Sequence, residues 1–147
     1  MKTIPREPTK EDIGWLSGIL DGEGSITFSR QEKYPHIYYG VHFVNTNREL
    51  MEKINRIISE ICRDLTDELP KISIPNYKAP IHIGKKVCHS ITLRRQNWII
   101  KVLEVLLPNL TEKRKKAAGL LNVLKNHKKG AWYTMEELKE AQWARRD

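Results

Sequence analysis

The sequence predicts an α+β domain in which pairs of antiparallel strands alternate with helices. Two observations carry this prediction: apolar residues recur at helical spacing in some segments and alternate with polar residues in others, and these segments follow the order α-ββ-α-ββ-α-α. The chain has 147 residues, the size of one domain, and no linker, repeat or low-complexity tract divides it. We therefore take residues 1–147 as a single domain.

The first half of the chain predicts a helix, two strands and a second helix. The first helix is expected from about Lys10 to Asp21, because Thr9 and Asp12 have the spacing of a capping box. Apolar and polar side chains then alternate over residues 25–33 and 38–45, and Pro35 marks the turn between these strands. Residues 47–65 carry apolar side chains at helical spacing, which predicts an amphipathic helix.

The second half predicts another pair of strands and more helices. The strands are expected at residues 70–77 and 87–95, joined by a basic loop. Helices are expected at residues 97–110 and 111–127, and a short one at residues 134–146. Each strand has one apolar face and one polar face, so the sheet is expected to pack on helices with one face only.

Charge favours a polyanionic partner. Lys and Arg number 26 against 18 Asp and Glu, which gives a net charge of +8. No apolar run approaches the roughly 20 residues of a membrane-spanning helix. The first residues also lack the apolar core of a signal peptide, so we expect an intracellular protein, cytoplasmic or organellar, without a membrane partner. Cys62 and Cys88 need not pair, which suits reduced thiols.

The polar faces of the strands are rich in hydrogen-bonding and basic side chains. A solvated sheet face is the ordinary interpretation, but a two-stranded ribbon also fits the major groove of DNA, where such groups read base edges. On the second interpretation, double-stranded DNA contacts the outward residues of the strands and their basic loops: Thr27, Ser29, Gln31, Lys33, Tyr38, Gly40, His42, Lys71, Ser73, Lys85, Lys86, Ser90, Thr92 and Arg94.

Small residues form a stripe on the first predicted helix. Gly14, Ser17, Gly18 and Asp21 fall at helical spacing and share one face. Each Gly lowers helix stability by roughly 0.5–1 kcal/mol relative to Ala, but a small stripe lets another backbone approach closely. The chain's own sheet is one possible neighbour. Because no other helix has a matching stripe, we expect these four residues at the interface of a two-fold homodimer.

Carboxylates follow the stripe in the segment Asp21-Gly22-Glu23-Gly24. Two such helix ends meeting at a dyad would bring together acids that repel one another unless a cation lies between them. Oxygen ligands suit Mg²⁺, and a metal beside a basic, DNA-sized surface indicates phosphodiester hydrolysis. A plain polar turn is the alternative. His82, His89 and the two cysteines lack the paired spacing of a structural zinc site.

Residues 16–24, Leu-Ser-Gly-Ile-Leu-Asp-Gly-Glu-Gly, resemble the nine-residue signature of the LAGLIDADG homing endonucleases. They depart from it by Ser and Gly for the two Ala, exchanged Ile and Leu, and Glu for the last Asp. The order of elements is also similar over nearly the whole chain. This resemblance implies an antiparallel sheet that forms a DNA-binding saddle. It also implies a Mg²⁺-dependent nuclease, intron-encoded or of intein origin, that cuts both strands of a long, near-palindromic site. A single signature implies a homodimer, and Mn²⁺ or Ca²⁺ could replace Mg²⁺ for binding.

The resemblance also implies roles for single residues. Glu23 matches the metal ligand, and the backbone carbonyl of Gly22 matches the neighbouring ligand. Asp21 matches a residue of the helix end and dimer contact. The polar active-site residue after the second strand matches Asn45, with Thr46 or Asn47 if the register shifts. The basic active-site residue matches Lys113, with Arg114 or Lys115 as alternatives. Arg48 is a poor match to a basic residue at the start of the second helix.

Two other functions are compatible with the same fold. An intron maturase would bind structured RNA, and a DNA-binding regulator would have lost catalysis. The acid at Glu23 and the basic group at Lys113 favour the nuclease, because a protein that only binds DNA gains little from carboxylates near phosphates. The sequence predicts no added helix-turn-helix segment, and this argues against the DNA-binding regulator.

Overall fold

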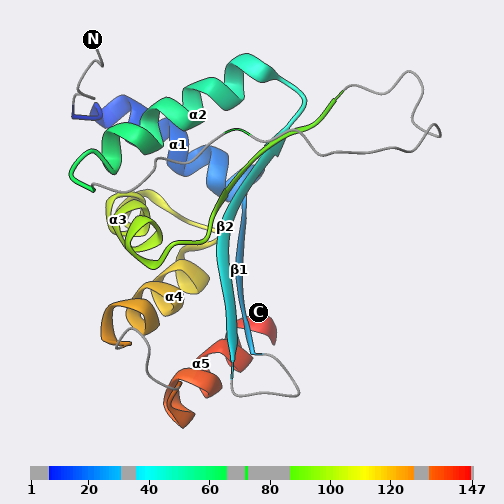
Figure 1. Ribbon diagram of the computed structural model, residues 1–147, viewed down its shortest axis with the longest axis vertical. Coiled ribbons are helices and arrows are strands. Elements are labelled where there is room, and N and C mark those ends of the chain that lie inside the picture. The colour runs from blue at the N-terminus through cyan, green and yellow to red at the C-terminus, as the bar shows by residue number, and fades with distance from the viewer. Residues whose placement is uncertain (1–6, 31–35, 66–71, 73–86, 128–132, 147) are drawn as a thin grey trace, which may run out of the picture.

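The computed structural model describes residues 7–30, 36–65, 72, 87–127 and 133–146, without the side chains of residues 142–146 (Figure 1). The elements in chain order are α1 (Lys10–Gly22), β1 (Ser25–Arg30), β2 (Ile37–Asn45), α2 (Arg48–Ile61), β3 (His89–Leu93), α3 (Gln96–Leu106), a 3-10 helix η2 (Leu107–Asn109), α4 (Arg114–Asn126) and α5 (Met135–Arg146). The predicted α+β class is confirmed. The predicted strand at residues 70–77 lies outside the described residues, apart from Ile72.

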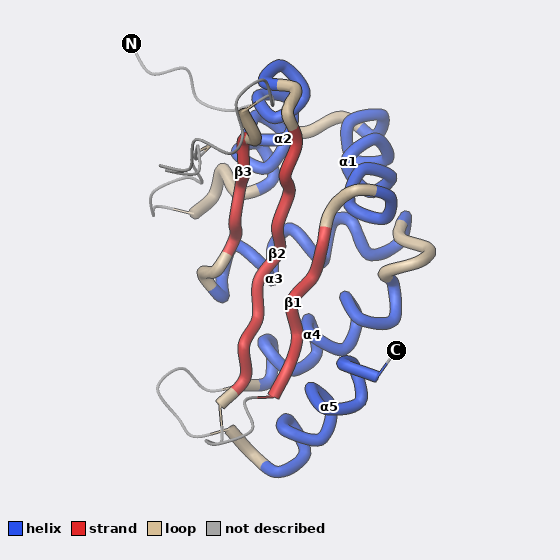
Figure 2. The backbone as a smooth tube through the Cα atoms, turned by 90° about the vertical axis from the view of Figure 1, so that its right-hand side faces the viewer, coloured by secondary structure: helices blue, strands red, loops and turns tan. Residues whose placement is uncertain are grey.

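The described strands form one antiparallel sheet in the order β1-β2-β3. All the described helices lie on one side of this sheet, with α1 and α2 toward one end and α4 and α5 toward the other (Figure 1). The opposite face of the sheet, which no described helix covers, turns toward the viewer in Figure 2. The sheet is therefore covered on one side only, as its alternating pattern predicts.

Strand periodicity decides which side chains enter the core. In the sheet Ile26 pairs with Val41, and Val41 pairs with Leu93 on its other side. All three are buried together with Phe28 and Phe43 from the same face. Burial of each such side chain stabilises the fold by roughly 1.5–3 kcal/mol. The residues between them point to the uncovered face, as the alternation predicts.

Some boundaries differ from the predicted ones for local reasons. The helix predicted to begin at residue 111 begins at Arg114, and the backbone N–H groups of Thr111 and Lys113 in the turn before it donate to Asp21. Likewise, α3 ends at Leu106 and continues only as a 3-10 turn containing Pro108, which has no N–H for a helical hydrogen bond. The predicted start of α1 is confirmed, since Thr9 Oγ1 accepts the N–H of Asp12 at 3.1 Å.

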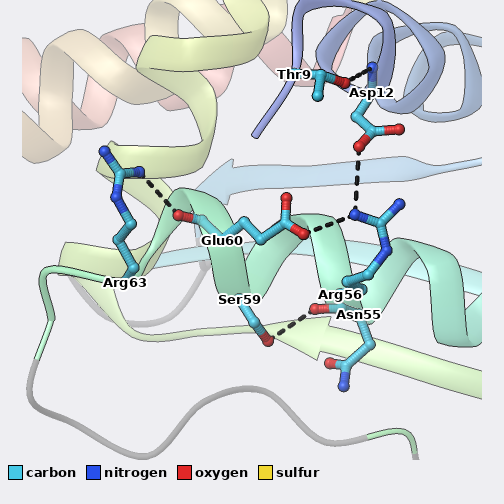
Figure 3. A network of polar contacts seen from close by, with 7 residues as sticks. All are labelled: Thr9, Asp12, Asn55, Arg56, Ser59, Glu60 and Arg63. Atoms are coloured by element: carbon cyan, nitrogen blue, oxygen red, sulfur yellow. Dashed lines mark hydrogen bonds and ion pairs between the residues drawn. The ribbon is translucent and has the colours of Figure 1, made fainter. Parts of the chain in front are cut away.

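A polar network links α1 to α2 (Figure 3). Arg56 of α2 donates to Asp12 of α1 at 3.3 Å and to Glu60 at 2.6 Å. Glu60 is only 4% exposed, so its carboxylate depends on the Arg56 guanidinium to offset the loss of water. The backbone carbonyl of Glu60 accepts a further hydrogen bond from Arg63 at 2.9 Å. This network joins α1 to α2 through the contact between Arg56 and Asp12.

Gly24 ends α1 and turns the chain into β1. The N–H groups of Glu23 and Gly24 both donate to the carbonyl of Ile19, at 2.8 and 2.9 Å. A Cβ atom on Gly24 would lie 2.7 Å from Leu20 Cδ1 and 3.0 Å from Leu20 Cα. Glycine is therefore required here by close approach of the backbone to the helix.

Both cysteines are free, Cys62 in the core and Cys88 on the surface. Burial raises the pKa of the Cys62 thiol to about 11, which makes it unreactive. Among the described helices, none has the length and apolar character needed to cross a membrane.

Candidate active site

The C-terminal end of α1 meets the end of β2. Asn45, the last residue of β2, donates from Nδ2 to Glu23 Oε2 at 3.1 Å. The Oδ1 atom of Asn45 accepts the backbone N–H of Asn47 at 2.8 Å, which fixes the orientation of the amide. Asn47 itself caps α2, since its Oδ1 accepts the N–H of Leu50 at 3.1 Å. Of the alternatives left open by the sequence, Asn45 is thus the one whose side chain contacts Glu23.

Lys113 lies at the same end of α1. Its Nζ donates to the backbone carbonyl of Asp21 at 2.6 Å, where the negative end of the helix dipole favours a cation. The Asp21 carboxylate holds this lysine in place, because its two oxygens accept the backbone N–H groups of Thr111 at 2.8 Å and Lys113 at 3.0 Å. Asp21 therefore acts as an anchor that ties the turn before α4 to the end of α1.

Asp21 can be tested through stability. We expect Asp21→Ala to lower the free energy of unfolding by about 2 kcal/mol, because two backbone donors lose a charged acceptor. Chemical denaturation measures this change. Glu112→Ala is the matched control, since Glu112 is an exposed carboxylate in the same turn. Equal stability losses in the two variants would contradict the role of Asp21.

The oxygen donors at this end of α1 fit a hard divalent cation. Glu23 is exposed, and its carboxylate has Asn45 as its hydrogen-bond partner among the described residues. Gly22 is also exposed and offers a backbone carbonyl at the helix end. The described part of the chain holds no group of three or more His, Cys, Asp or Glu side chains placed to bind a metal. One chain thus offers only part of a set of oxygen ligands, the Glu23 carboxylate and the Gly22 carbonyl.

The exposed stripe of α1 differs from the predicted one. Gly14, Gly18 and Gly22 are exposed, and a Cβ on any of them would meet no described atom within 4 Å other than the neighbouring backbone of α1. Ser17 is instead 1% exposed, and its hydroxyl donates to the carbonyl of Ile13 at 2.7 Å within the core. The expectation that Ser17 contacts a partner was wrong, because α1 turns that residue toward α3. The stripe of exposed glycines has i, i+4, i+8 spacing, and Asp21 at its side is bonded within the chain.

The uncovered sheet face carries the polar residues that the alternation predicts. Those within the described part of the chain are Thr27, Ser29, Tyr38, His42, Ser90, Thr92 and Arg94. Gln31, Lys33, Lys71, Ser73, Lys85 and Lys86 lie outside it. Gly40 is buried, contrary to expectation, and a Cβ added to it would lie 3.0 Å from His42 Nε2. Ser25 and Val44 share this face and are exposed; the same two-residue period could have identified them.

His42 lies across the middle of this face. Its Nε2 is 3.1 Å from Thr27 Oγ1 on β1, and its Nδ1 is 3.3 Å from Thr92 Oγ1 on β3. Burial, and then the positive charge of Arg94, lower the pKa of His42 below its usual value. The imidazole is therefore neutral at neutral pH.

Comparison with known proteins identifies the fold. No family model and no curated protein sequence matches the chain. Among solved structures, the LAGLIDADG meganuclease I-AabMI bound to uncleaved DNA superposes with a TM-score of 0.60 and 17% identity, covering 88% of this chain and 42% of that one. The homing endonuclease I-CvuI, in complex with a DNA target in the presence of Mg, gives 0.55 and 16%, covering 90% and 95%. The group I intron-encoded homing endonuclease I-CeuI complexed with DNA gives 0.52 and 15%, covering 85% and 57%.

Proposed function

Because the chain has the fold of the LAGLIDADG homing endonucleases, we propose that it is a site-specific DNA endonuclease that acts as a homodimer and hydrolyses phosphodiester bonds with Mg²⁺. The observation that carries this proposal is the meeting of Glu23, Asn45 and Lys113 at the end of α1. A carboxylate (Glu23), an amide (Asn45) and an ammonium group (Lys113), from three separate segments, lie beside the uncovered polar face of the sheet. The structures that share the fold include complexes with DNA.

The sheet would bind the major groove of double-stranded DNA. Its uncovered face has hydroxyl, imidazole and guanidinium groups that read base edges, and the net charge of +8 suits a phosphate backbone. The nine residues of β2 extend over roughly 30 Å, which corresponds to about nine base pairs at 3.4 Å each. A dimer would then cover on the order of 18 base pairs, in two related half-sites.

The glycine stripe of α1 supports the dimer. Glycine at three exposed helix positions is unfavourable for a single chain, and among the described residues nothing beyond the neighbouring backbone of α1 would lie within 4 Å of a Cβ added there. A second copy of α1, packed about a two-fold axis, would use the space that the missing side chains leave. This arrangement would also bring the Glu23 side chains of the two copies near one dyad.

The chain's own residues would prepare the DNA for hydrolysis in three ways. Glu23 and the Gly22 carbonyl would hold Mg²⁺, which when bound activates water and neutralises charge on the phosphate. The amide of Asn45 keeps the Glu23 carboxylate in one orientation. Lys113 would stabilise the negative charge that develops on the phosphate oxygens, since Asp21 holds its ammonium group at the end of α1.

The proposal is tested by selecting targets from a plasmid library of randomised sequences incubated with the purified chain and Mg²⁺. We expect a narrow set of long, near-palindromic sites to be cut in both strands, and EDTA to prevent cutting. A structured group I intron RNA serves as the competing substrate. Tight binding to that RNA without any selected DNA site would favour a maturase and contradict the proposal.

A further inference from the structure

His42 joins two hydroxyl groups across the whole width of the described sheet. It pairs directly with Thr92 on β3 and lies diagonally from Thr27 on β1. Each of its ring nitrogens is within hydrogen-bond distance of one of these hydroxyls, at 3.1 Å for Thr27 and 3.3 Å for Thr92. A Cβ on Gly40 would lie 3.0 Å from His42 Nε2, so glycine at this position leaves room for the ring.

The chemistry of a neutral imidazole makes the two hydroxyls unequal. The ring has one N–H donor and one bare nitrogen. The hydroxyl that faces the bare nitrogen must donate its proton to the ring, so toward any further partner it can only accept. The hydroxyl that receives the ring N–H keeps its own proton and can still donate. The lowered pKa of His42, caused by burial and by Arg94, keeps the ring in this neutral state at neutral pH.

We propose that Thr27, His42 and Thr92 form one coupled reading unit in which only one of the two hydroxyls can donate a hydrogen bond to DNA at a time. This inference rests on the proposed function, in which the uncovered face lies in the major groove. A change of imidazole tautomer exchanges the two roles, so either hydroxyl can be the donor. The unit therefore reads two base positions jointly rather than separately.

The ligand class follows from the base edges. Guanine and thymine present only acceptors of their own in the major groove, whereas adenine and cytosine each carry an amino donor. Where one contacted base is guanine or thymine, only the tautomer that lets the facing hydroxyl donate makes both hydrogen bonds. Where both contacted bases carry amino groups, both hydroxyls can accept, so either tautomer makes both hydrogen bonds. A site with acceptor-only bases at both positions leaves one hydrogen bond unmade. We expect the affinity for such sites to be about tenfold lower than the affinity calculated by adding the separate free-energy preferences at the two positions.

The test is a binding selection over randomised half-sites with the wild-type chain in EDTA, so that binding rather than cleavage is read. Thr27→Val and Thr92→Val identify the two base positions, because each variant loses the preference at its own position. In the wild type, guanine or thymine at one position should then exclude guanine and thymine at the other. In His42→Phe the exclusion should disappear, since the ring no longer links the hydroxyls.

Controls separate the possible outcomes. Circular dichroism verifies that His42→Phe is folded; if it is not, His42→Leu takes its place, because it also removes both ring nitrogens that bond the hydroxyls. Ser29→Ala, on the same sheet face, should preserve the exclusion. Enriched sites in which the two positions vary independently, or an exclusion that persists in folded His42→Phe, would overturn this inference alone. If no sequence is enriched, both the proposed function and the inference are contradicted.

Discussion

Glu23→Gln should lower the rate of DNA cleavage by at least about 100-fold, while the affinity for the target site stays the same or rises. The loss of a metal ligand removes several kcal/mol of transition-state stabilisation. Gln keeps the shape of Glu and an oxygen that can accept the hydrogen bond from Asn45, so the site retains its geometry. Removing a negative charge close to phosphate also favours binding. Single-turnover cleavage and fluorescence anisotropy with the same duplex measure the two quantities.

Glu11→Gln is the matched control for this variant. Glu11 has the same chemistry and lies in the same helix, but in its first turn, far from the candidate site. It should cleave at the wild-type rate. A Glu23→Gln protein that cleaves within tenfold of the wild type would show that Glu23 does not hold the metal.

Gly18→Leu should convert the proposed dimer to a monomer and abolish double-strand cleavage. Within the described part of one chain the new side chain has space, because a Cβ at this position meets no atom within 4 Å beyond the neighbouring backbone of α1. In a helix interior Leu is also more favourable than Gly by roughly 1 kcal/mol, so the free energy of unfolding of the chain should not fall. Between two copies of α1, however, a branched side chain would hold the backbones apart. Sedimentation velocity measures the oligomeric state directly.

Ala118→Leu controls for the added bulk, because Ala118 is exposed on α4 rather than on α1. This variant should remain a dimer. Were Gly18→Leu to sediment as an unchanged dimer, the interface would lie elsewhere, and the exposed glycines of α1 would need another explanation.

The sequence was sufficient to predict the fold class because most of the described elements have a local signal. Thr9 caps α1 as expected, and the alternation in β1 and β2 separates core residues from outward ones except at Gly40, which is buried. The rotation of α1 could not be predicted with the same accuracy. Ser17 and Gly22 lie on opposite sides of Gly14 and Gly18 on α1. Only the packing of α1 against α3 shows that Ser17 is buried and Gly22 is exposed.

The contacts within the site depend on long-range geometry that periodicity does not contain. Asn45 and Asn47 have the same chemistry, and the structure distinguishes them because one contacts Glu23 while the other caps α2. Similarly, the sequence places Thr27, His42 and Thr92 on one face, but their hydrogen bonds depend on the register of β3 against β2. That register joins two strands that lie far apart in the sequence, since His42 and Thr92 are separated by 50 residues.

The central claim is that this chain is a Mg²⁺-dependent DNA endonuclease whose metal ligand is Glu23. It is tested most directly by following one duplex, carrying a site that the chain binds specifically, over time with Mg²⁺ and with EDTA. We expect Mg²⁺ to convert the duplex into two double-stranded fragments and EDTA to leave it bound but intact. Specific binding without cleavage at any Mg²⁺ concentration would contradict the claim and make the chain a DNA-binding protein without nuclease activity.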